Sequence, residues 1–548
     1  MAPESERRLL ELLGEKPLRR DLLIEYLHAI QDAEGCLPAA LIAALAQAMR
    51  LSQVEVFEVA SFYHHFDIVR DGEERPPTLT VRVCDSVACE LAGARELLER
   101  LPGLLGAAVR VQAVPCVGRC AQAPVAVVGT RPVDYATVQA VDAAVQAREF
   151  VSPGPSGFAL AGDRVSVLPK APPGRFPMLQ ALIDETVEPA AVMQRLESAT
   201  LRGMGGAGFP AGRKWRIVSG QPGPRMLVVN ADEGEPGTFK DRFWLECEPS
   251  RFLEGMLIAA WAVGCSQCFI YLRDEYAGLR TMLEQALQAL RGTPPRGWPL
   301  PEIELRRGAG AYVCGEESAL IESVEGKRGM PRLRPPYVAE VGLFGQPTLA
   351  HNVETLAWVP ILLQQGAGWF EAHGRRGRKG LRSFSVSGRV REPGVKIAPA
   401  GISVRELIDE YCGGMVEGHA LKAYLPGGAS GGILPAALAD EPLDFDTLQP
   451  HGAFIGSAAV VVLSDRDDLK AVARNLMRFF RHESCGQCTP CRAGTAKAES
   501  LLAASHWDQP LLRELSQTMI DASICGLGQA APNPVLSLMR HFPQELER

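Results

Sequence analysis

Eight of the fourteen cysteines fall into two groups of four that are far apart in the sequence. One group reads Cys-x4-Cys and then Cys-x3-Cys, and the other reads Cys-x2-Cys-x2-Cys with one distant partner. Four thiolates can hold a [2Fe-2S] or a [4Fe-4S] cluster. Zinc also takes four cysteines, but usually as two Cys-x2-Cys halves. The spacing therefore favours clusters and one-electron chemistry, and a zinc-stabilised nucleotide-binding scaffold is the alternative. The proposed ligands are Cys84, Cys89, Cys116 and Cys120 in the first group and Cys485, Cys488, Cys491 and Cys525 in the second.

Other residues that could do chemistry have a simpler interpretation. Cys265 and Cys268 form a Cys-x-x-Cys pair, but they lead into an apolar strand, so we expect them to pack in a core. We likewise expect His64 and His65 to be surface or packing residues rather than ligands.

A glycine-rich segment at residues 203–208 fits the dinucleotide pattern Gly-x-Gly-x-x-Gly through Gly203, Gly205 and Gly208. Residues 190–197 before it read as helix, not strand, so the segment is not predicted to be a Rossmann turn. Glycines still let backbone amides approach a phosphate, and Lys214 adds a positive charge. A flexible loop without a ligand is the alternative.

Two further segments have the composition of ligand-binding loops. A strand at residues 226–230 runs into Asp232, Glu233 and Glu235, whose carboxylates suit hydroxyls and amides better than phosphate. Residues 308–318 place Tyr312 among glycines, as a wall for a flat ligand, with two glutamates as polar handles. The alternatives are a charged surface loop for the first segment and a tight loop under a helix that begins at Ser318 for the second.

The hydrophobic pattern divides the chain into a multidomain α/β protein. Residues 1–75 read as a helical bundle. Residues 76–150 read as strand, helix, strand, strand, helix, at 79–84, 91–101, 107–114, 123–128 and beyond, with the four cysteines on loops at strand ends. Residues 151–175 read as linker, 176–379 as a larger α/β region, 380–463 as a compact β-rich segment and 464–548 as helical.

Composition narrows the class of protein. The chain has 548 residues and a net charge of −7, with no basic run, so we expect no nucleic-acid partner. The N-terminus is polar, and the apolar runs are too short to span a bilayer. These features predict a cytoplasmic protein with reduced thiols and no membrane contact.

Five of these segments together resemble the flavoprotein subunit of the complex I family. They are the glycine motif at 205–215, the acidic motif at 230–242, the motif at 308–317, and the cysteine motifs at 483–492 and 523–528. Ser61-Phe-Tyr and the first four cysteines resemble the family's thioredoxin-like [2Fe-2S] subunit, here fused to the flavoprotein. The resemblance implies a thioredoxin-like domain at 76–150, a Rossmann-like FMN and NADH domain at 176–379, a ubiquitin-like β-grasp domain of the SLBB type at 380–463 and a helical [4Fe-4S] domain at 464–548.

The resemblance also implies roles for individual residues, with FMN, one [2Fe-2S] cluster and one [4Fe-4S] cluster as cofactors and NAD(H) as substrate. No side chain is expected to be catalytic, since hydride transfer would occur at FMN with Glu317 nearby. The implied FMN contacts are Gly203, Gly205, Gly206, Gly208, Lys214, Asn230, Asp232, Glu233, Tyr312, Gly315, Glu316 and Asn352. The implied NADH contacts are Phe209, Lys214, Glu235, Glu317, Arg334 and Tyr337. His351 and Tyr337 depart from the family pattern, which has Asn and Phe at these positions.

The fused arrangement resembles the β subunit of NAD-dependent formate dehydrogenases that contain molybdenum or tungsten, through residues 19–28, 341–345 and 425–435. This implies a diaphorase function and an α-subunit partner that carries the metal site and further clusters. The diaphorase subunit of an NAD-reducing hydrogenase is the alternative.

Overall fold

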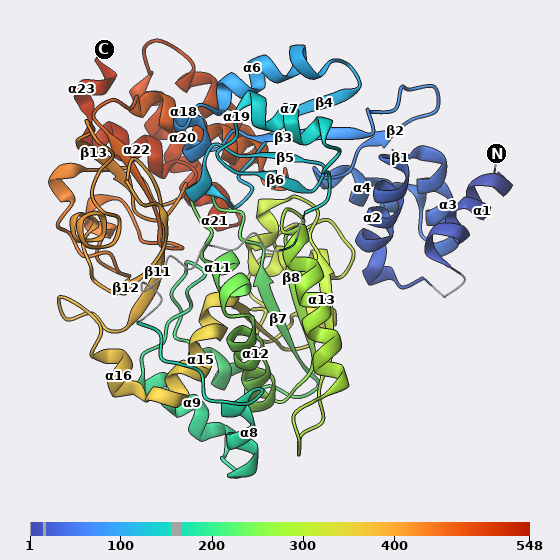
Figure 1. Cartoon of the computed structure of the whole chain (residues 1–548), viewed down its shortest axis with the longest axis vertical. Helices are drawn as coiled ribbons and strands as arrows, with labels where there is room; N and C mark the ends of the chain where they lie inside the picture. The colour runs from blue at the N-terminus through green and yellow to red at the C-terminus, as the bar shows by residue number, and fades with distance from the viewer. Residues whose placement is uncertain (1, 15–17, 153, 155–166, 548) are drawn as a thin grey trace.

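The structure, a computed structural model, describes residues 2–14, 18–152, 154 and 167–547. The chain begins with four helices that lie to one side of the molecule in Figure 1. They are α1 (Ala2–Leu13), α2 (Leu23–Glu34), α3 (Ala39–Met49) and α4 (Gln53–Phe62). The predicted bundle is therefore confirmed, with one addition: β1 (Leu37–Pro38) and β2 (Ile68–Val69) pair in parallel. Most of the predicted linker lies outside the described residues.

The first cysteine set belongs to a four-stranded sheet in the order β4-β3-β5-β6, in which only β3 and β4 are parallel. Its elements are β3 (Leu79–Cys84), α5 (Val87–Leu91), α6 (Ala94–Leu105), β4 (Val109–Val114), β5 (Ala126–Val128), β6 (Arg131–Val133) and α7 (Val138–Gln146). The predicted helix at 91–101 corresponds to α6, shifted by three to four residues, but the prediction missed the short helix α5 that directly follows β3. The prediction that all four cysteines lie on loops is also wrong. Cys84 ends β3, Cys89 lies in α5 and Cys120 begins a 3-10 turn.

The larger α/β region is built on a parallel sheet in the order β10-β7-β8-β9. The strands are β7 (Arg225–Ala231), β8 (Cys265–Leu272), β9 (Glu302–Arg307) and β10 (Thr348–Asn352). The main helices are α8 (Pro177–Asp184), α9 (Pro189–Ser198), α10 (Ala211–Ser219), α11 (Lys240–Cys247), α12 (Pro249–Val263), α13 (Ala277–Gly292), α14 (Glu317–Val324), α15 (Val353–Gln365) and α16 (Ala367–Glu371). The glycine segment connects α9 to α10, which confirms that it is not a strand-to-helix turn. All four strands end at one edge of the sheet, where parallel sheets bind ligands.

The β-rich segment forms a five-stranded mixed sheet in the order β12-β11-β15-β13-β14. Its strands are β11 (Leu381–Gly388), β12 (Gly394–Pro399), β13 (Leu421–Leu425), β14 (Leu434–Pro435) and β15 (Ala459–Ser464). The first and last strands are parallel neighbours at the centre, and the other pairs are antiparallel. This is the strand order of a ubiquitin-like β-grasp fold.

The chain ends in helices that carry the second cysteine set and lie beside the β-grasp sheet (Figure 1). They are α18 (Leu469–His482), α19 (Thr489–Leu502), α20 (Gln509–Ala522), α21 (Gly526–Ala530), α22 (Asn533–His541) and α23 (Pro543–Leu546). Among the described residues, no helix is long and apolar enough to cross a membrane. The domain limits at 75, 150, 175, 379 and 463 stay a prediction.

Candidate cofactor sites

The first four cysteines meet in the interior of the thioredoxin-like domain. All four are buried and none forms a disulfide. The sulfur atoms of Cys116 and Cys120 lie 3.3 Å apart. Hydrogen bonds from the Cys120 and Cys84 thiols lower the pKa of Cys116 well below its usual value. The hydrogen bonds of Cys84 with Cys116 and Cys89 raise the pKa of Cys84. The four sulfur atoms therefore form one group, as a cluster requires.

The loop that carries Cys116 is fixed to the parallel-sheet domain by buried cations. Arg273, directly after β8, donates from Nη2 to the carbonyl oxygen of Cys116 at 2.6 Å and from Nη1 to the carbonyl of Glu233. Arg242 donates to the carbonyl of Gly118 at 3.0 Å. Gly118 has a φ of +72°, and a Cβ there would collide with the ring and hydroxyl of Tyr276. Close approach of the two domains therefore requires glycine at this position.

The second four cysteines line one small cavity among the C-terminal helices, together with Val313, which follows β9. Cys488 and Cys525 occupy the N-cap positions of α19 and α21. Burial raises the pKa of Cys491 to about 12 and that of Cys525 to about 11. Four thiols around one cavity are the arrangement expected of ligands that lose their protons when a metal cluster binds.

The glycine loop, residues 203–208, contacts the N-terminus of α15. Met204 donates its backbone N–H to the Thr355 hydroxyl at 2.8 Å. Asn352 caps α15 by accepting from the Thr355 N–H at 3.2 Å. A Cβ on Gly205 would lie 3.4 Å from the Cβ of Asn352. Backbone amides of the loop and a helix N-terminus are thus brought together, which is the physical basis of anion binding.

The loops after β7 and β9 form a cradle with an unused acceptor. Asn230 donates from Nδ2 to the carbonyl of Gly315 at 2.7 Å and accepts from the Asp232 N–H at 3.0 Å. Oδ2 of Asp232 is buried and has no hydrogen-bond partner among the described residues. Burial raises the pKa of Asp232 well above its usual value. A hydroxyl-bearing ligand such as a ribityl chain would satisfy this oxygen, so the residues present fit FMN.

The side chain of Glu233 is turned away from this cradle. It accepts hydrogen bonds from the N–H groups of Asp241 and Arg242, at 2.7 and 3.1 Å, and from the Tyr276 hydroxyl at 2.9 Å. Burial, with a smaller contribution from Asp241, raises the pKa of Glu233 to about 7. Because Glu233 and Glu235 are both buried, the alternative of a charged surface loop is wrong.

Three residues with implied NADH contacts meet in one charged group. Lys214 donates to Glu317 at 3.1 Å and to the carbonyl of Ala350 at 2.8 Å. Arg334 pairs with Glu317 at 3.3 Å and also with Glu316. Although burial opposes it, the charges of Lys214 and Arg334 lower the pKa of Glu317.

The two aromatic residues with implied adenine contacts are open to solvent. The exposed fraction is 42% for Phe209 and 55% for Tyr337. Both rings are therefore accessible to a ligand, although single exposed aromatic residues such as Tyr135, at 63%, are common and do not by themselves indicate a site.

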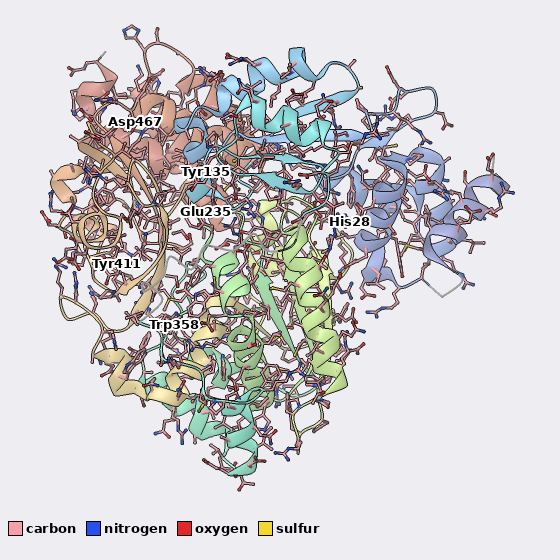
Figure 2. All side chains as sticks on the ribbon, viewed as in Figure 1. His28, Tyr135, Glu235, Trp358, Tyr411 and Asp467 are labelled. Carbon is pink, nitrogen blue, oxygen red and sulfur yellow. The ribbon has the colours of Figure 1, made fainter. Side chains whose placement is uncertain are left out.

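Glu235 lies where three parts of the chain meet (Figure 2), and Tyr312 lies beside it. Their side chains hydrogen-bond to each other, and Glu235 also accepts from the N–H and hydroxyl of Ser430 at 2.8 and 2.7 Å. The ring of Tyr312 packs on Phe479 of α18, and its N–H donates to Glu483 at 2.8 Å. Both side chains thus join the sheet domain to the β-grasp and C-terminal domains.

Sequence reasoning missed a buried ion-pair network beneath the site. Lys240 has an exposed fraction of 1% and lies 2.9 Å from both Asp241 and Glu354. Although burial opposes it, these carboxylates raise the pKa of Lys240. Asn352 donates to Asp241 at 3.2 Å, so the network supports the cap of α15. No local signal could have revealed it, because Glu354 is distant in sequence.

His351, a departure from the family pattern, is a packing residue here. Its Nε2 accepts from the indole N–H of Trp215 at 2.8 Å, and burial lowers its pKa well below the usual value. The buried cysteines Cys265 and Cys268 are likewise core residues, as predicted.

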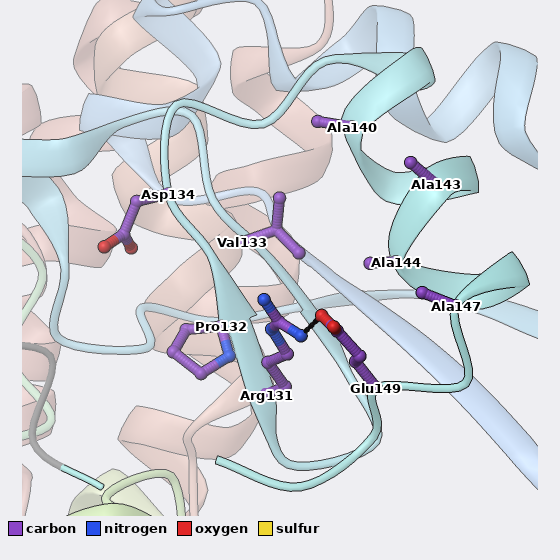
Figure 3. Close-up of a pocket in the computed structure, with 9 residues that line it drawn as sticks. All are labelled: Arg131, Pro132, Val133, Asp134, Ala140, Ala143, Ala144, Ala147 and Glu149. Atoms are coloured by element: carbon purple, nitrogen blue, oxygen red, sulfur yellow. Dashed lines mark ion pairs between the residues drawn. The ribbon is translucent and has the colours of Figure 1, made fainter. Parts of the chain in front are cut away.

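A cavity of about 430 Å³ lies between β6 and α7 and is bounded by the ion pair of Arg131 with Glu149. Figure 3 shows the residues that line it. Its lining is otherwise mostly alanine and carries none of the eight ligand cysteines. It is therefore unrelated to the cofactor sites.

Comparison with known proteins decides the family. Family models match residues 9–149 as a thioredoxin-like [2Fe-2S] ferredoxin, 196–361 as the Nuo51 FMN-binding domain and 471–548 as the NADH-ubiquinone oxidoreductase-F iron-sulfur binding region. One NADH-quinone oxidoreductase subunit of Rhizobium meliloti is 40% identical over 371 residues, which are 65% of this chain and 88% of the relative. The chain belongs to the complex I flavoprotein family.

Two further matches agree with this assignment. The mitochondrial NADH dehydrogenase [ubiquinone] flavoprotein 1 of Dictyostelium discoideum is 42% identical, over 65% of this chain and 78% of the relative. The crystal structure of an NAD⁺-reducing [NiFe]-hydrogenase in the H₂-reduced state is 35% identical, with a TM-score of 0.83, over 96% of this chain and 92% of that chain. The hydrogenase match includes the fused N-terminal part.

As a member of the complex I flavoprotein family, the chain has an FMN-binding domain, a [2Fe-2S] domain and a [4Fe-4S] domain. The choice between clusters and zinc is thereby decided for clusters. The chain is an oxidoreductase subunit of the NADH dehydrogenase or diaphorase type, and NADH is the substrate of its family. Its relatives work within multisubunit complexes.

Proposed function

We propose that this chain exchanges electrons with NAD(H) on behalf of a partner subunit that oxidises a second substrate. The observation that carries the proposal is that both cysteine sets are fixed to loops of one flavin domain, through Arg273 on one side and Tyr312 on the other. Nicotinamide transfers two electrons as hydride, whereas clusters take one, and bound FMN converts between the two.

In this proposal FMN is bound by the loops at the carboxyl edge of the parallel sheet. The glycine loop supplies amides for the phosphate, with Lys214 as a nearby charge. Asn230 orients the cradle, and the buried oxygen of Asp232 accepts from a ribityl hydroxyl. Because Glu233 is occupied by the N–H groups of α11, its part is to hold the loop in place.

The proposed NADH site lies beside the glycine loop. Phe209 and Tyr337 offer exposed rings to the adenine, and Lys214, Glu317 and Arg334 offer polar contacts to the ribose and phosphate groups. Glu235 is the weakest member of the set, because its carboxylate is already bonded to Tyr312 and Ser430. No side chain is required as acid or base; the residues orient nicotinamide and exclude water.

For the partner we propose the molybdenum- or tungsten-containing α subunit of an NAD-dependent formate dehydrogenase. The support is the likeness of residues 19–28, 341–345 and 425–435 to the β subunit of that enzyme. A specific observation favours the second candidate, a hydrogenase partner: the matched NAD⁺-reducing [NiFe]-hydrogenase covers 96% of this chain.

The experiment is to purify the chain anaerobically, alone and with whatever subunit co-purifies. Alone, it should contain one FMN and about six iron atoms. It should reduce ferricyanide with NADH and have no activity on formate or hydrogen. With its partner, NAD⁺ reduction by formate supports the first candidate and NAD⁺ reduction by hydrogen the second. Formate oxidation by the lone chain would refute the division of labour.

A further inference from the structure

Two histidines face each other where the N-terminal bundle meets the parallel-sheet domain. His28 lies on α2 with an exposed fraction of 2%, and His65 follows α4. Their ring centroids are 4.8 Å apart. One nitrogen of each ring is already hydrogen-bonded. His28 Nε2 bonds to the carbonyl of Gly308 at 2.9 Å, and His65 Nδ1 bonds to Asp274 at 2.9 Å. Figure 2 labels His28 at this contact between the bundle and the body of the molecule.

The other nitrogen of each ring has no such partner. Nδ1 of His28 and Nε2 of His65 are buried, and neither has a hydrogen bond among the described residues. An imidazole that donates one N–H to a carbonyl or carboxylate presents a lone pair on its other nitrogen. Burial, followed by the neighbouring His65 and Arg307, lowers the pKa of His28 well below its usual value, so this ring stays neutral. Each ring therefore keeps one buried nitrogen that no described residue uses, and which a metal ion can take.

Asp32 completes a set of three. It lies one helical turn after His28, on the same face of α2. One carboxylate oxygen of Asp32 and one nitrogen of each histidine all lie within 4.8 Å of one another. Arg307 donates to Asp32 Oδ2 at 2.5 Å but to Oδ1 at only 3.3 Å, and it also holds Asp274 at 2.6 Å. Oδ1 of Asp32 is thus the oxygen more available to a ligand.

Two of the three groups, Asp32 and His65, can be reached from outside. Asp32, His65 and Asp274 line a cavity of about 360 Å³, and the side chain of Asp32 is 54% exposed. An ion could therefore enter without unfolding the interface.

We propose that His28, His65 and Asp32 bind a divalent metal ion of the zinc class. Two imidazoles, which bind metal in their neutral form, and one carboxylate are a ligand set that zinc takes with a water in the fourth position. Gly308 and Asp274 act as outer partners that fix the two rings. The ion would join the bundle to the loop after β9, where the His65 backbone N–H already bonds to the Ala309 carbonyl at 3.2 Å. None of the three proposed ligands is a proposed cofactor ligand, although the cavity that Asp32 and His65 line extends to Cys116 and Asp232. The proposal does not rest on the proposed function.

A neighbouring histidine group provides a matched control. His64, His482 and Glu483 also lie close together. There, however, His64 Nε2 bonds to the carbonyl of His482 at 3.2 Å, and His482 Nδ1 bonds to Glu483 at 3.0 Å. Glu483 in turn accepts from Tyr312. Both oxygens of Glu483 are thus occupied, and the two imidazole rings are exposed and stacked with centroids 4.1 Å apart, so this group should not retain a metal.

The experiment uses the full chain, purified anaerobically with its clusters, exposed to Zn²⁺ and freed of excess metal. We expect about one zinc per chain, and X-ray absorption should show nitrogen and oxygen neighbours at about 2.0–2.1 Å without sulfur at about 2.3 Å. His65→Gln and Asp32→Asn should lose this zinc, and Asp274→Asn should bind it about 10–100-fold more weakly. His64→Gln should bind it as the wild type does. Iron content should be equal in all variants.

Several results would overturn the proposal. They are the absence of bound zinc, retention of zinc by both His65→Gln and Asp32→Asn, loss of zinc in His64→Gln, or a sulfur shell around the zinc. Because Asp32 is exposed, its variant should fold even if a histidine variant does not. Iron and NADH-dependent ferricyanide reduction are measured on the same samples, so failure of the metal site is distinguishable from failure of the proposed electron transfer.

Discussion

Arg273 offers a quantitative test of how the parallel-sheet domain controls the first cluster. The Arg273 side chain has an exposed fraction of 4% and donates at 2.6 Å to the carbonyl of Cys116, a proposed cluster ligand. Bond lengths then put its charge about 7 Å from the ligand sulfur. At an effective dielectric constant of about 20, a unit charge at that distance contributes about 2.4 kcal/mol. For a one-electron couple this corresponds to about 100 mV.

Replacing Arg273 by methionine removes a positive charge that favours the reduced cluster. The reduction potential of the [2Fe-2S] cluster should therefore fall by about 100 mV. Arg273→Lys keeps the charge and should shift the potential much less, although it loses the paired hydrogen bonds to Cys116 and Glu233. The assay is a redox titration followed by electron paramagnetic resonance, with iron content measured to verify that the cluster is retained.

The reasoning is refuted if Arg273→Met retains its iron but moves the potential by less than about 20 mV. It is also refuted if Arg273→Lys shifts the potential as far as Arg273→Met, because charge would then not be the cause. The potential of the [4Fe-4S] cluster serves as an internal reference, since it should change little in either variant.

Five further outcomes are expected. Lys240→Met leaves two buried carboxylates without their cation and should lower the free energy of unfolding of the flavin domain by about 3–5 kcal/mol. Unfolding is measured through the change in FMN fluorescence when the flavin is released. Lys214→Met breaks the partly exposed ion pair with Glu317 and should lower the free energy of unfolding by less than about 1 kcal/mol. Folding raises the pKa of Glu233 to about 7, so between about pH 4.5 and 7 the folded state holds a proton that the unfolded state has lost. The free energy of unfolding should therefore fall as the pH rises from about 4.5 to 7. Thermal unfolding of Glu233→Gln over the same pH range should show a smaller fall. Tyr337→Ala should raise the KM for NADH while FMN stays bound, and loss of FMN would contradict its assignment. Cys488→Ser should abolish the [4Fe-4S] resonance and leave the [2Fe-2S] resonance unchanged.

Local sequence patterns predicted the elements that have a clear period. The alternation at 79–84 became β3 with the predicted limits, and the helix before the glycine loop excluded a Rossmann turn. The same patterns failed at short elements such as α5 and β6, because five or three residues are too few to show a period.

Side chains that act across domains could not be predicted from local patterns. Arg273 reaches Cys116, 157 residues away, and His28 reaches Gly308, 280 residues away. Nothing beside either residue in the sequence indicates that partner. The family resemblance placed Glu235 and Tyr312 at a ligand site, yet in the structure both are bonded across domain boundaries. A motif predicts that a residue matters, but its partners follow from the fold.

The arrangement of the loops gives a physical reason for combining these domains in one chain. The loop after β7 carries Asp232 and is held through Arg273 to the first cysteine set. The loop after β9 carries Tyr312 and is held through Glu483 to the helices of the second set. Both loops leave the same edge of one parallel sheet, and Asn230 bonds one to the other through Gly315. A displacement of either cluster domain must therefore also move the flavin cradle. The distances from the cradle to the two cysteine sets are thus fixed by backbone and buried side chains rather than by mobile contacts.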